Sequence, residues 1–474
     1  MDGLFRRKPL ADDANDNTHD HPHGLKRCLS ALDLTLLGIG AIIGTGIFVL
    51  TGHAAATQSG PAVVLSFVVA GLACAFAALA YAELAAMVGG CGSAYGYSYA
   101  AFGELIAWII GWDLILEYGV SVAAVANGWS GYFNNALTAI GYGLPEYLTK
   151  GPAVGGLVNL PAVGIILALM FMLIAGVKQS ARLNAAMVAV KLLTIAVFVG
   201  VAMFNVHPEN WTPFMPFGWF DTTADGHTVG VLAGASLVFF AYVGFDAVST
   251  AVEEAHDPQT DVPKGIIWSL GFCTIIYIVV SGLLTGIVPY TTLNVSSPVA
   301  HALMSIGYNW ASALVATGVI FGLTTVMLVL YYGLTRIIVA ISRDGLLPQF
   351  FSAVSPTTHT PVRTTVITGV IMAIAAGFIP LGALAELVNI GTLAAFVLVS
   401  LGVIVLRKTH PDAPRPYRMP FGTVLAWLGV LSCGALIAFL PLMTHLRFLL
   451  WLGVGMVIYF AYSMRNSRLA KQGA

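Results

Sequence analysis

Residues 38–48 read GIGAIIGTGIF, an apolar stretch with glycines at positions 38, 40, 44 and 46. Glycine in a helix interior costs about 1 kcal/mol relative to alanine, so this cluster predicts a break in the helix at Gly44-Thr45-Gly46. A lone glycine in a membrane helix more commonly allows close packing against a neighbour. Four glycines within nine residues favour the break over simple packing.

A second interrupted helix is predicted around residues 239–246, which read FFAYVGFD. Bulky aromatic residues, one glycine and Asp246 interrupt an otherwise apolar run. The remaining apolar runs are uniform and predict continuous helices.

The composition indicates a membrane protein. Of 474 residues, 58% are hydrophobic and 9% are charged, whereas about 25% of the residues in a soluble domain are charged. This excludes a soluble enzyme, a nucleic-acid binder and a disordered chain, and it leaves an all-α polytopic membrane protein. The net charge of −1 suggests no electrostatic partner.

Apolar runs near twenty residues long predict about twelve membrane spans. The polar N-terminal tail, residues 1–30, has no apolar core of a signal peptide. We divide the chain into this cytoplasmic tail, two five-span units (31–205 and 206–408) and a last segment of two spans (409–474). The expected spans are 34–58, 62–87, 102–128, 160–177, 182–205, 229–251, 265–288, 309–341, 363–380, 384–406, 421–442 and 446–464.

The distribution of Lys and Arg predicts the orientation. With the N-terminus in the cytoplasm, 18 of the 21 Lys and Arg residues lie at the cytoplasmic side, Lys150 and Arg447 lie outside, and Lys191 lies within a span. Positive charge collects on the cytoplasmic side of membrane proteins. We therefore expect a multi-pass protein of the cell (inner) membrane with both termini in the cytoplasm.

The two interrupted spans are the first and the sixth, so they cross the bilayer in opposite directions. This is the pattern of an inverted repeat of spans 1–5 and 6–10, which places a substrate site near the midplane. Free N–H groups at a half-helix start attract a carboxylate, and unwound carbonyls attract an ammonium. Such a site suits an α-amino acid.

The chain resembles the amino acid–polyamine–organocation (APC) superfamily, specifically the bacterial members of its cationic amino acid transporter branch. Animal members carry two further C-terminal spans. The resemblance implies the LeuT-like arrangement of five plus five helices with helices 1 and 6 broken, followed by two more. It rests on GIGAIIGTGIF (38–48), GWDLILEY (111–118), FFAYVGFDAVSTAVEEAHDPQTDVPKGI (239–266), RDGLLP (343–348) and LRKTHPDAPRPYRMP (406–420).

The substrate site is expected around the two breaks. The substrate carboxylate should meet the amides of Gly44, Thr45 and Gly46, and its amine the carbonyls of Ile42, Phe240 and Val243. By its position beside the second break, and by similarity to the gating aromatic of such transporters, Phe240 is expected to cover the substrate; simple packing is the alternative. The full set is Ile42, Ile43, Gly44, Thr45, Gly46, Phe239, Phe240, Ala241 and Val243.

Lys191 is the candidate for coupling to protons. It lies roughly 14 Å into span 5, counted at 1.5 Å per residue, and an ionisable group at that depth is either functional or satisfied by carbonyls for structural reasons. The resemblance implies that its amine replaces the Na⁺ of sodium-driven relatives. Its acceptors would be the carbonyls of Gly40 and Ile43, with Thr324 and Thr325 of span 8 nearby.

Further buried acids are Asp113 and Glu117, four residues apart on one helical face. For Glu117, a role in coupling and a structural hydrogen bond are both open. Asp246 is expected to cap the second half of span 6 or to line the site. Glu83 and Glu386 lie near helix ends and are expected to be structural.

These features together predict a secondary transporter that imports L-amino acids with a proton, or alternatively an amino-acid exchanger. No motif for ATP, a metal or another cofactor occurs, and no catalytic set points to an enzyme. Residues 321–325 (FGLTT), the expected site wall on span 8, contain no acid to face a basic substrate side chain. Neutral substrates are therefore expected.

Overall fold

The computed structural model describes residues 6–7, 29–88, 94–176, 181–223, 228–355, 358 and 360–472. Most of the expected N-terminal tail (1–30) lies outside these residues, and so does part of the loop after span 2. The described chain is mostly helical. Two short strands, β1 (Asp221–Thr222) and β2 (Thr228–Val229), pair antiparallel in the connection before span 6.

The first half of the chain, as far as residue 202, forms helices in the regions of the first five expected spans. Its shorter turns lie at Glu146–Leu148 and Pro152–Val154. The main elements are α1 (Ala31–Ile42), η1 (Gly46–Leu50), α2 (Thr51–Ala54), η2 (Ala55–Ser59), η3 (Gly60–Ala62), α3 (Val63–Val88), α4 (Ala94–Ala101), α5 (Glu104–Ala139), α6 (Leu160–Ile174) and α7 (Ala181–Ala202).

The second half supplies the remaining helices. Short 3₁₀ turns lie at Pro208–Trp211, Tyr290–Thr292 and Gln349–Ser352. The main elements are α8 (Val231–Val238), η7 (Phe239–Tyr242), η8 (Phe245–Glu254), α9 (Pro258–Ile287), α10 (Pro298–Ser305), α11 (Asn309–Arg343), α12 (Val362–Phe378), α13 (Leu381–Thr409), α14 (Val424–Ala438), α15 (Leu442–Ile458), η11 (Tyr459–Ser463), α16 (Met464–Asn466) and α17 (Arg468–Gln472).

Eight helical stretches in the described chain are long and apolar enough to cross a membrane. Four shorter apolar helices, α1, α6, α12 and α14, have 12, 15, 17 and 15 residues. Every expected span coincides with one or more of these helices, so the prediction of a polytopic helical membrane protein is confirmed.

Several span limits differ from the prediction. The third span was expected to end at residue 128, but α5 continues to Ala139, because polar residues such as Asn134 and Asn135 prolong a helix that an apolar count ends early. Helix α9 begins at Pro258, seven residues before the expected limit. Proline is well accommodated in a first turn, where its missing N–H would be unpaired in any case.

Local sequence explains where the first helices begin and turn. Ser30 and Asp33 form a capping box at the start of α1, with Ser30 N–H donating to Asp33 Oδ2 at 3.0 Å and Asp33 N–H to Ser30 Oγ at 3.3 Å. Between η2 and α3 the chain turns at Gly60, whose φ of 63° favours glycine.

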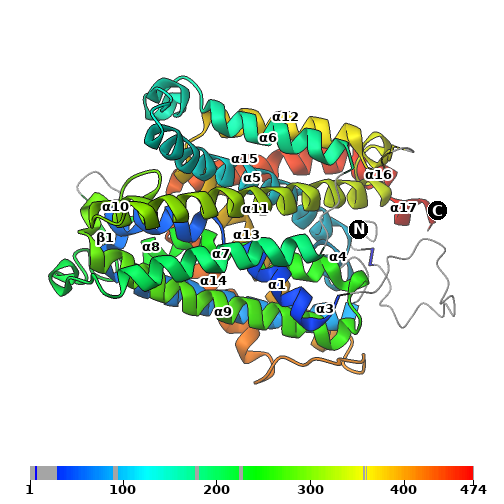
Figure 1. Ribbon diagram of the computed structural model, residues 1–474. Coiled ribbons are helices and arrows are strands. Elements are labelled where there is room, and N and C mark those ends of the chain that lie inside the picture. The colour runs from blue at the N-terminus through cyan, green and yellow to red at the C-terminus, as the bar shows by residue number, and fades with distance from the viewer. Residues whose placement is uncertain are drawn as a thin grey trace.

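Among the helix pairs that make extensive contacts, alongside α1 with α9, α5 with α13 and α13 with α14, are three of one kind: α5 with α11, α3 with α9, and α6 with α12. Figure 1 shows α5 beside α11 through the middle of the bundle and α6 beside α12 along one edge. Each of these three pairs joins helices that are five expected spans apart.

Tryptophans join α15 to α5. Trp112 Nε1–H donates to the Trp451 carbonyl at 2.9 Å, and Trp451 Nε1–H donates back to the Trp112 carbonyl at 3.1 Å. The two rings stack with centroids 4.5 Å apart. Trp108 Nε1–H donates to the Gly455 carbonyl at 2.9 Å. These bonds attach α15 firmly to α5.

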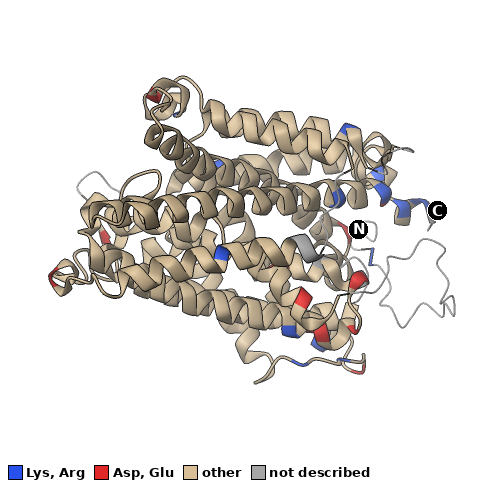
Figure 2. Ribbon diagram, in the orientation of Figure 1, with Lys and Arg blue, Asp and Glu red and all other residues tan. Residues whose placement is uncertain are grey.

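Charged residues are unevenly distributed along the bundle. Figure 2 shows many of the Lys and Arg residues at the end where α17 lies. By its number, Lys191 falls near the middle of α7 (Ala181–Ala202). The apolar middle of the bundle is what a bilayer requires of a spanning protein.

Candidate functional site at the two helix breaks

The predicted break in span 1 is present, one residue earlier than expected. Helix α1 ends at Ile42, Ile43 is extended (φ −72°, ψ 100°), and a helical run resumes around Gly46. Among the described residues, the amides of Gly44, Thr45 and Gly46 donate to no backbone or side-chain acceptor. The Thr45 side chain is 0% exposed, and its hydroxyl also has no partner there.

The predicted break in span 6 is present as well. Helix α8 passes into the 3₁₀ segment η7, and the chain then turns at Val243 (ψ 130°) and Gly244 (φ 116°) before η8 begins. Glycine alone adopts such a φ without strain. A Cβ at Gly244 would also lie 3.1 Å from the backbone of Ala41 in α1. The glycine therefore permits both the turn and the close approach of α1.

The two breaks contact each other directly. A Cβ added to Gly46 would lie 2.5 Å from Ala241 Cβ, so span 1 and span 6 touch at this point. The Tyr277 hydroxyl of α9 lies between the carbonyls of Ile42 (2.9 Å) and Ala241 (2.8 Å). Sequence reasoning missed Tyr277, because one tyrosine in an apolar helix resembles a packing residue.

Two of the three expected acceptors for a substrate amine already accept hydrogen bonds. The Ile42 carbonyl accepts from Tyr277, and the Phe240 carbonyl accepts the Val243 N–H at 3.3 Å. The Val243 carbonyl accepts no hydrogen bond from the described residues. Of the three, it is the carbonyl most available to an ammonium.

The neighbouring aromatic residues differ in their surroundings. Phe239 is fully buried and meets Phe396 of α13 edge to face, with centroids 5.7 Å apart. Phe240 is 6% exposed and is absent from that aromatic cluster. Phe239 therefore anchors η7 to α13, whereas Phe240 has fewer aromatic constraints.

One expectation about span 8 is wrong. Phe321 is 55% exposed on the outside of α11 and cannot belong to a wall of the site. The residue of α11 beside the first break is Val326, whose Cγ2 lies 3.6 Å from where a Cβ on Gly44 would stand. The error arose because five consecutive residues of a helix cannot share one face.

Lys191 makes one of its two expected contacts. Its Nζ donates to the Gly40 carbonyl at 2.5 Å, and the side chain is 1% exposed. It donates to no other acceptor in the described chain, so the bond to Ile43 is not made. Its carbon chain packs against Gly322 of α11, where a Cβ would lie 3.0 Å from Lys191 Cγ.

The two threonines of α11 have other partners. The hydroxyls of Thr324 and Thr325 donate to carbonyls of their own helix, at 2.8 and 2.7 Å. Thr324 Oγ1 also accepts the Trp129 Nε1–H at 3.0 Å. The structure thus places Gly322, rather than these hydroxyls, against the lysine.

The buried acids gather between α5, α13 and η8. Asp113 and Glu117 are buried, and neither carboxylate oxygen of Asp113 has a hydrogen-bond partner in the described chain. Asp246 Oδ2 accepts the Tyr118 hydroxyl at 3.3 Å, which links η8 to α5. Within the described residues, no three His, Cys, Asp or Glu side chains are placed to hold a metal ion.

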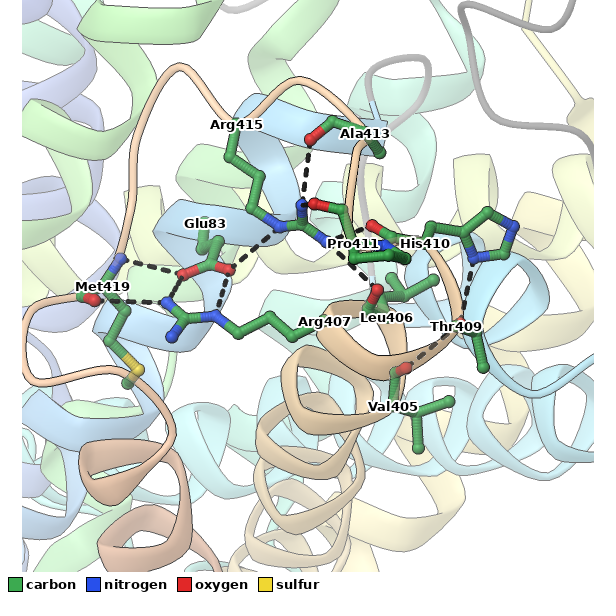
Figure 3. A network of polar contacts seen from close by, with 10 residues as sticks. All are labelled: Glu83, Val405, Leu406, Arg407, Thr409, His410, Pro411, Ala413, Arg415 and Met419. Carbon is green, nitrogen blue, oxygen red and sulfur yellow. Dashed lines mark hydrogen bonds and ion pairs between the residues drawn. The ribbon is translucent and has the colours of Figure 1, made fainter.

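Glu83 connects three parts of the chain at the end of α3. Its carboxylate accepts from Arg407 Nε at 2.9 Å, from Arg407 Nη2 at 2.5 Å and from the Met419 amide at 2.8 Å, as Figure 3 shows. Arg415 lies 3.7 Å away and donates to four carbonyls at the end of α13 and beyond it. Glu386 accepts from Thr444. These contacts fit the structural roles expected of both glutamates.

Comparison with known proteins gives consistent matches. A family model described as amino acid permease matches residues 29–461. A branched-chain amino acid permease of Bacillus subtilis (strain 168) is 50% identical over 98% of this chain and 99% of its own. A methylthioribose transporter of the same organism is 48% identical over 99% and 100%. Human cationic amino acid transporter 4 is 39% identical over 87% of this chain and 64% of its own.

Proposed function

The chain belongs to the amino acid permease family of the APC superfamily, and from that premise we propose that it imports L-amino acids with a proton by alternating access. It would do so as a secondary transporter, with twelve spans of which the first ten form an inverted repeat. The contacts of α3 with α9, α5 with α11 and α6 with α12 support this arrangement, because each pair joins corresponding members of the two halves.

One observation carries the proposal: at the span 1 break, the amides of Gly44, Thr45 and Gly46 and the buried hydroxyl of Thr45 all lack partners among the described residues. Burying a polar group without a partner costs roughly 1–3 kcal/mol. A substrate carboxylate would satisfy both the amides and the hydroxyl, and the start of the following half-helix favours its charge. The Val243 carbonyl would accept the substrate ammonium.

The substrate side chain is proposed to be neutral and apolar. The side chains of Val326 and Phe240 beside the breaks are both apolar. Between the relatives named for branched-chain amino acids and for methylthioribose, the site favours the amino acid, because unpaired amides suit a carboxylate. Methylthioribose carries neither a carboxylate nor an ammonium.

Uptake of labelled isoleucine into liposomes tests the function. Liposomes empty of amino acid, with an imposed inward pH gradient, should concentrate isoleucine, and collapse of the gradient should stop it. Uptake only when the liposomes contain amino acid would instead show an exchanger. Competition by methylthioribose but not by leucine, or by arginine but not by alanine, would contradict the proposed substrate class.

Orientation can be tested by cysteine labelling. With both termini in the cytoplasm, as the Lys and Arg distribution indicates, Thr222→Cys should react with an impermeant maleimide in intact cells and Lys471→Cys should not. Both positions are exposed. The native Cys74, Cys273 and Cys433 are buried, and Cys28 and Cys91 would be replaced by serine. Labelling at residue 471 would refute the topology.

Phe240→Ala should impair transport more than it impairs stability. As a cover over the substrate, Phe240 contributes to binding, whereas a purely packing phenylalanine costs about 3–5 kcal/mol of stability when truncated. Phe198→Ala in α7, where the ring is 1% exposed and follows Lys191 by seven residues or about two turns, is the matched control. We expect the control to lose thermal stability and Phe240→Ala chiefly to raise KM. Equal losses of stability in both would favour simple packing.

A further inference from the structure

Asn389 of α13 bonds to the backbone of the broken sixth span. Its Nδ2 donates to the Ser236 carbonyl at 2.7 Å and to the Leu237 carbonyl at 3.1 Å. The side chain is fully buried. The two carbonyls belong to the last turn of α8, directly before the 3₁₀ segment η7.

The surroundings fix the orientation of this amide. With the amide reversed, Oδ1 would face two carbonyl oxygens and repel both, so the nitrogen must lie there. Oδ1 itself has no partner among the described residues. The side chain therefore serves as a double donor to α8, although this leaves its own oxygen unsatisfied.

Those carbonyls lie in the last turn of α8, where the Phe239 N–H donates to the carbonyls of Ala235 and Leu237 and Asn389 donates to those of Ser236 and Leu237. The last carbonyls of an α-helix have no N–H group four residues ahead that can reach them. Bonds from a neighbouring helix stabilise such an end and favour the change to a tighter 3₁₀ turn at that point. Asn389 thus supports the transition that begins at Phe239.

A second contact between the same helices fixes the next residue. Phe396 of α13, seven residues and about two turns after Asn389, meets Phe239 edge to face. Helix α13 therefore contacts both the last turn of α8, through Asn389, and the first residue of η7, through Phe396. Phe240, the next residue, takes its position from this attachment.

We propose that Asn389 is a positioning residue for substrate selectivity: by donating to the carbonyls of Ser236 and Leu237 it sets where η7 begins, and so where Phe240 stands over the substrate side chain. The proposal rests on the proposed function. A shift of η7 changes the room for the substrate side chain more than it changes the contacts of the carboxylate, which lie on span 1. Asn389 should therefore control the preference for large over small side chains.

The test compares kcat/KM for isoleucine and alanine in liposomes. Asn389→Leu keeps the size and removes both donors, and Asn389→Asp replaces donors with acceptors. Because differences of a methylene or two in an apolar site give about 10–200-fold discrimination, we expect the isoleucine-to-alanine ratio to fall about tenfold or more in both. Asn389→Gln, which keeps the amide, should restore most of the ratio.

Tyr331→Phe is the matched control. It removes a buried hydroxyl that donates to the Thr365 carbonyl, between α11 and α12. We expect it to lower the melting temperature as Asn389→Leu does and to leave the selectivity ratio unchanged. A purely structural role for Asn389 would give this same result.

The outcomes separate the inference from the function on which it rests. A folded Asn389→Leu with the wild-type ratio overturns the inference. If that variant does not fold, Asn389→Ser, with one donor in a smaller side chain, must still show a lowered ratio, and a wild-type ratio there overturns it equally. Wild-type protein that transports no amino acid overturns the proposed function, and the inference fails with it.

Discussion

Lys191→Ala is expected to keep some substrate binding and to lose accumulation driven by a pH gradient. The Lys191 amine donates to the Gly40 carbonyl of α1, and a hydrogen bond from a charged donor is stronger than one from a neutral donor, so we expect protonation of the amine and its contact with α1 to be coupled. Protonated, the amine would tie α7 to α1 in a binding-ready state. Deprotonated, it would release α1 and allow the site to open inward.

Three measurements on purified protein in liposomes check this mechanism. Isoleucine accumulation under an imposed pH gradient should fall to background in Lys191→Ala, while ligand-induced thermal stabilisation persists. Sodium should change nothing in the wild type. Asn184→Ala is the matched control, because Asn184 lies on the same helix, also beside Gly40, but cannot titrate. If Lys191→Ala still concentrates substrate, Glu117 becomes the next candidate.

Gly44→Ala is expected to abolish substrate binding while the fold stays intact. A Cβ at Gly44 would stand at an ordinary 3.6 Å from Val326, so the chain accepts the methyl group, but the methyl group crowds the amides that the carboxylate should reach. Each hydrogen bond to a charged group contributes about 1.5–3 kcal/mol. Loss of one such bond alone would weaken binding by tenfold or more.

Gly46→Ala supplies the contrasting case. There the added Cβ would lie within 2.5 Å of Ala241 Cβ and would also collide with the Ala241 backbone, which cannot yield as a flexible side chain could. We expect Gly46→Ala to lower the melting temperature sharply, and Gly44→Ala to leave it within a few degrees of the wild type. An unchanged KM for isoleucine in Gly44→Ala would contradict the assignment of the carboxylate site.

Sequence alone predicted those features that depart from the pattern of an ordinary membrane helix. Clustered glycines located the first break to within one residue, and Gly244 among aromatic residues located the second. Lys191 was notable as an isolated lysine within a span, and the resemblance to the APC superfamily supplied the Gly40 carbonyl as its acceptor. In each case an unusual residue imposes a backbone or electrostatic requirement that few structures satisfy.

The residues that support the breaks were not predictable in this way. Tyr277 and Asn389 are each one of several polar residues scattered along long, mainly apolar helices, and such residues commonly satisfy any nearby carbonyl. Whether such a residue supports a helix break depends on which carbonyl accepts its hydrogen bond. That carbonyl is determined by the packing of helices that are far apart in the sequence. Likewise, Val326 rather than Phe321 faces the first break, because the rotation of α11 about its axis is set by its neighbours.

The reciprocal tryptophan hydrogen bonds between α5 and α15 can form only late in biosynthesis. Trp112 leaves the ribosome 339 residues before Trp451, so α5 enters the bilayer long before the groups that complete its hydrogen bonding exist. Unsatisfied polar groups in hydrocarbon cost several kcal/mol each. A nascent chain that stops short of α15 therefore leaves the indole N–H groups of Trp108 and Trp112 without the α15 carbonyls that accept them in the folded protein.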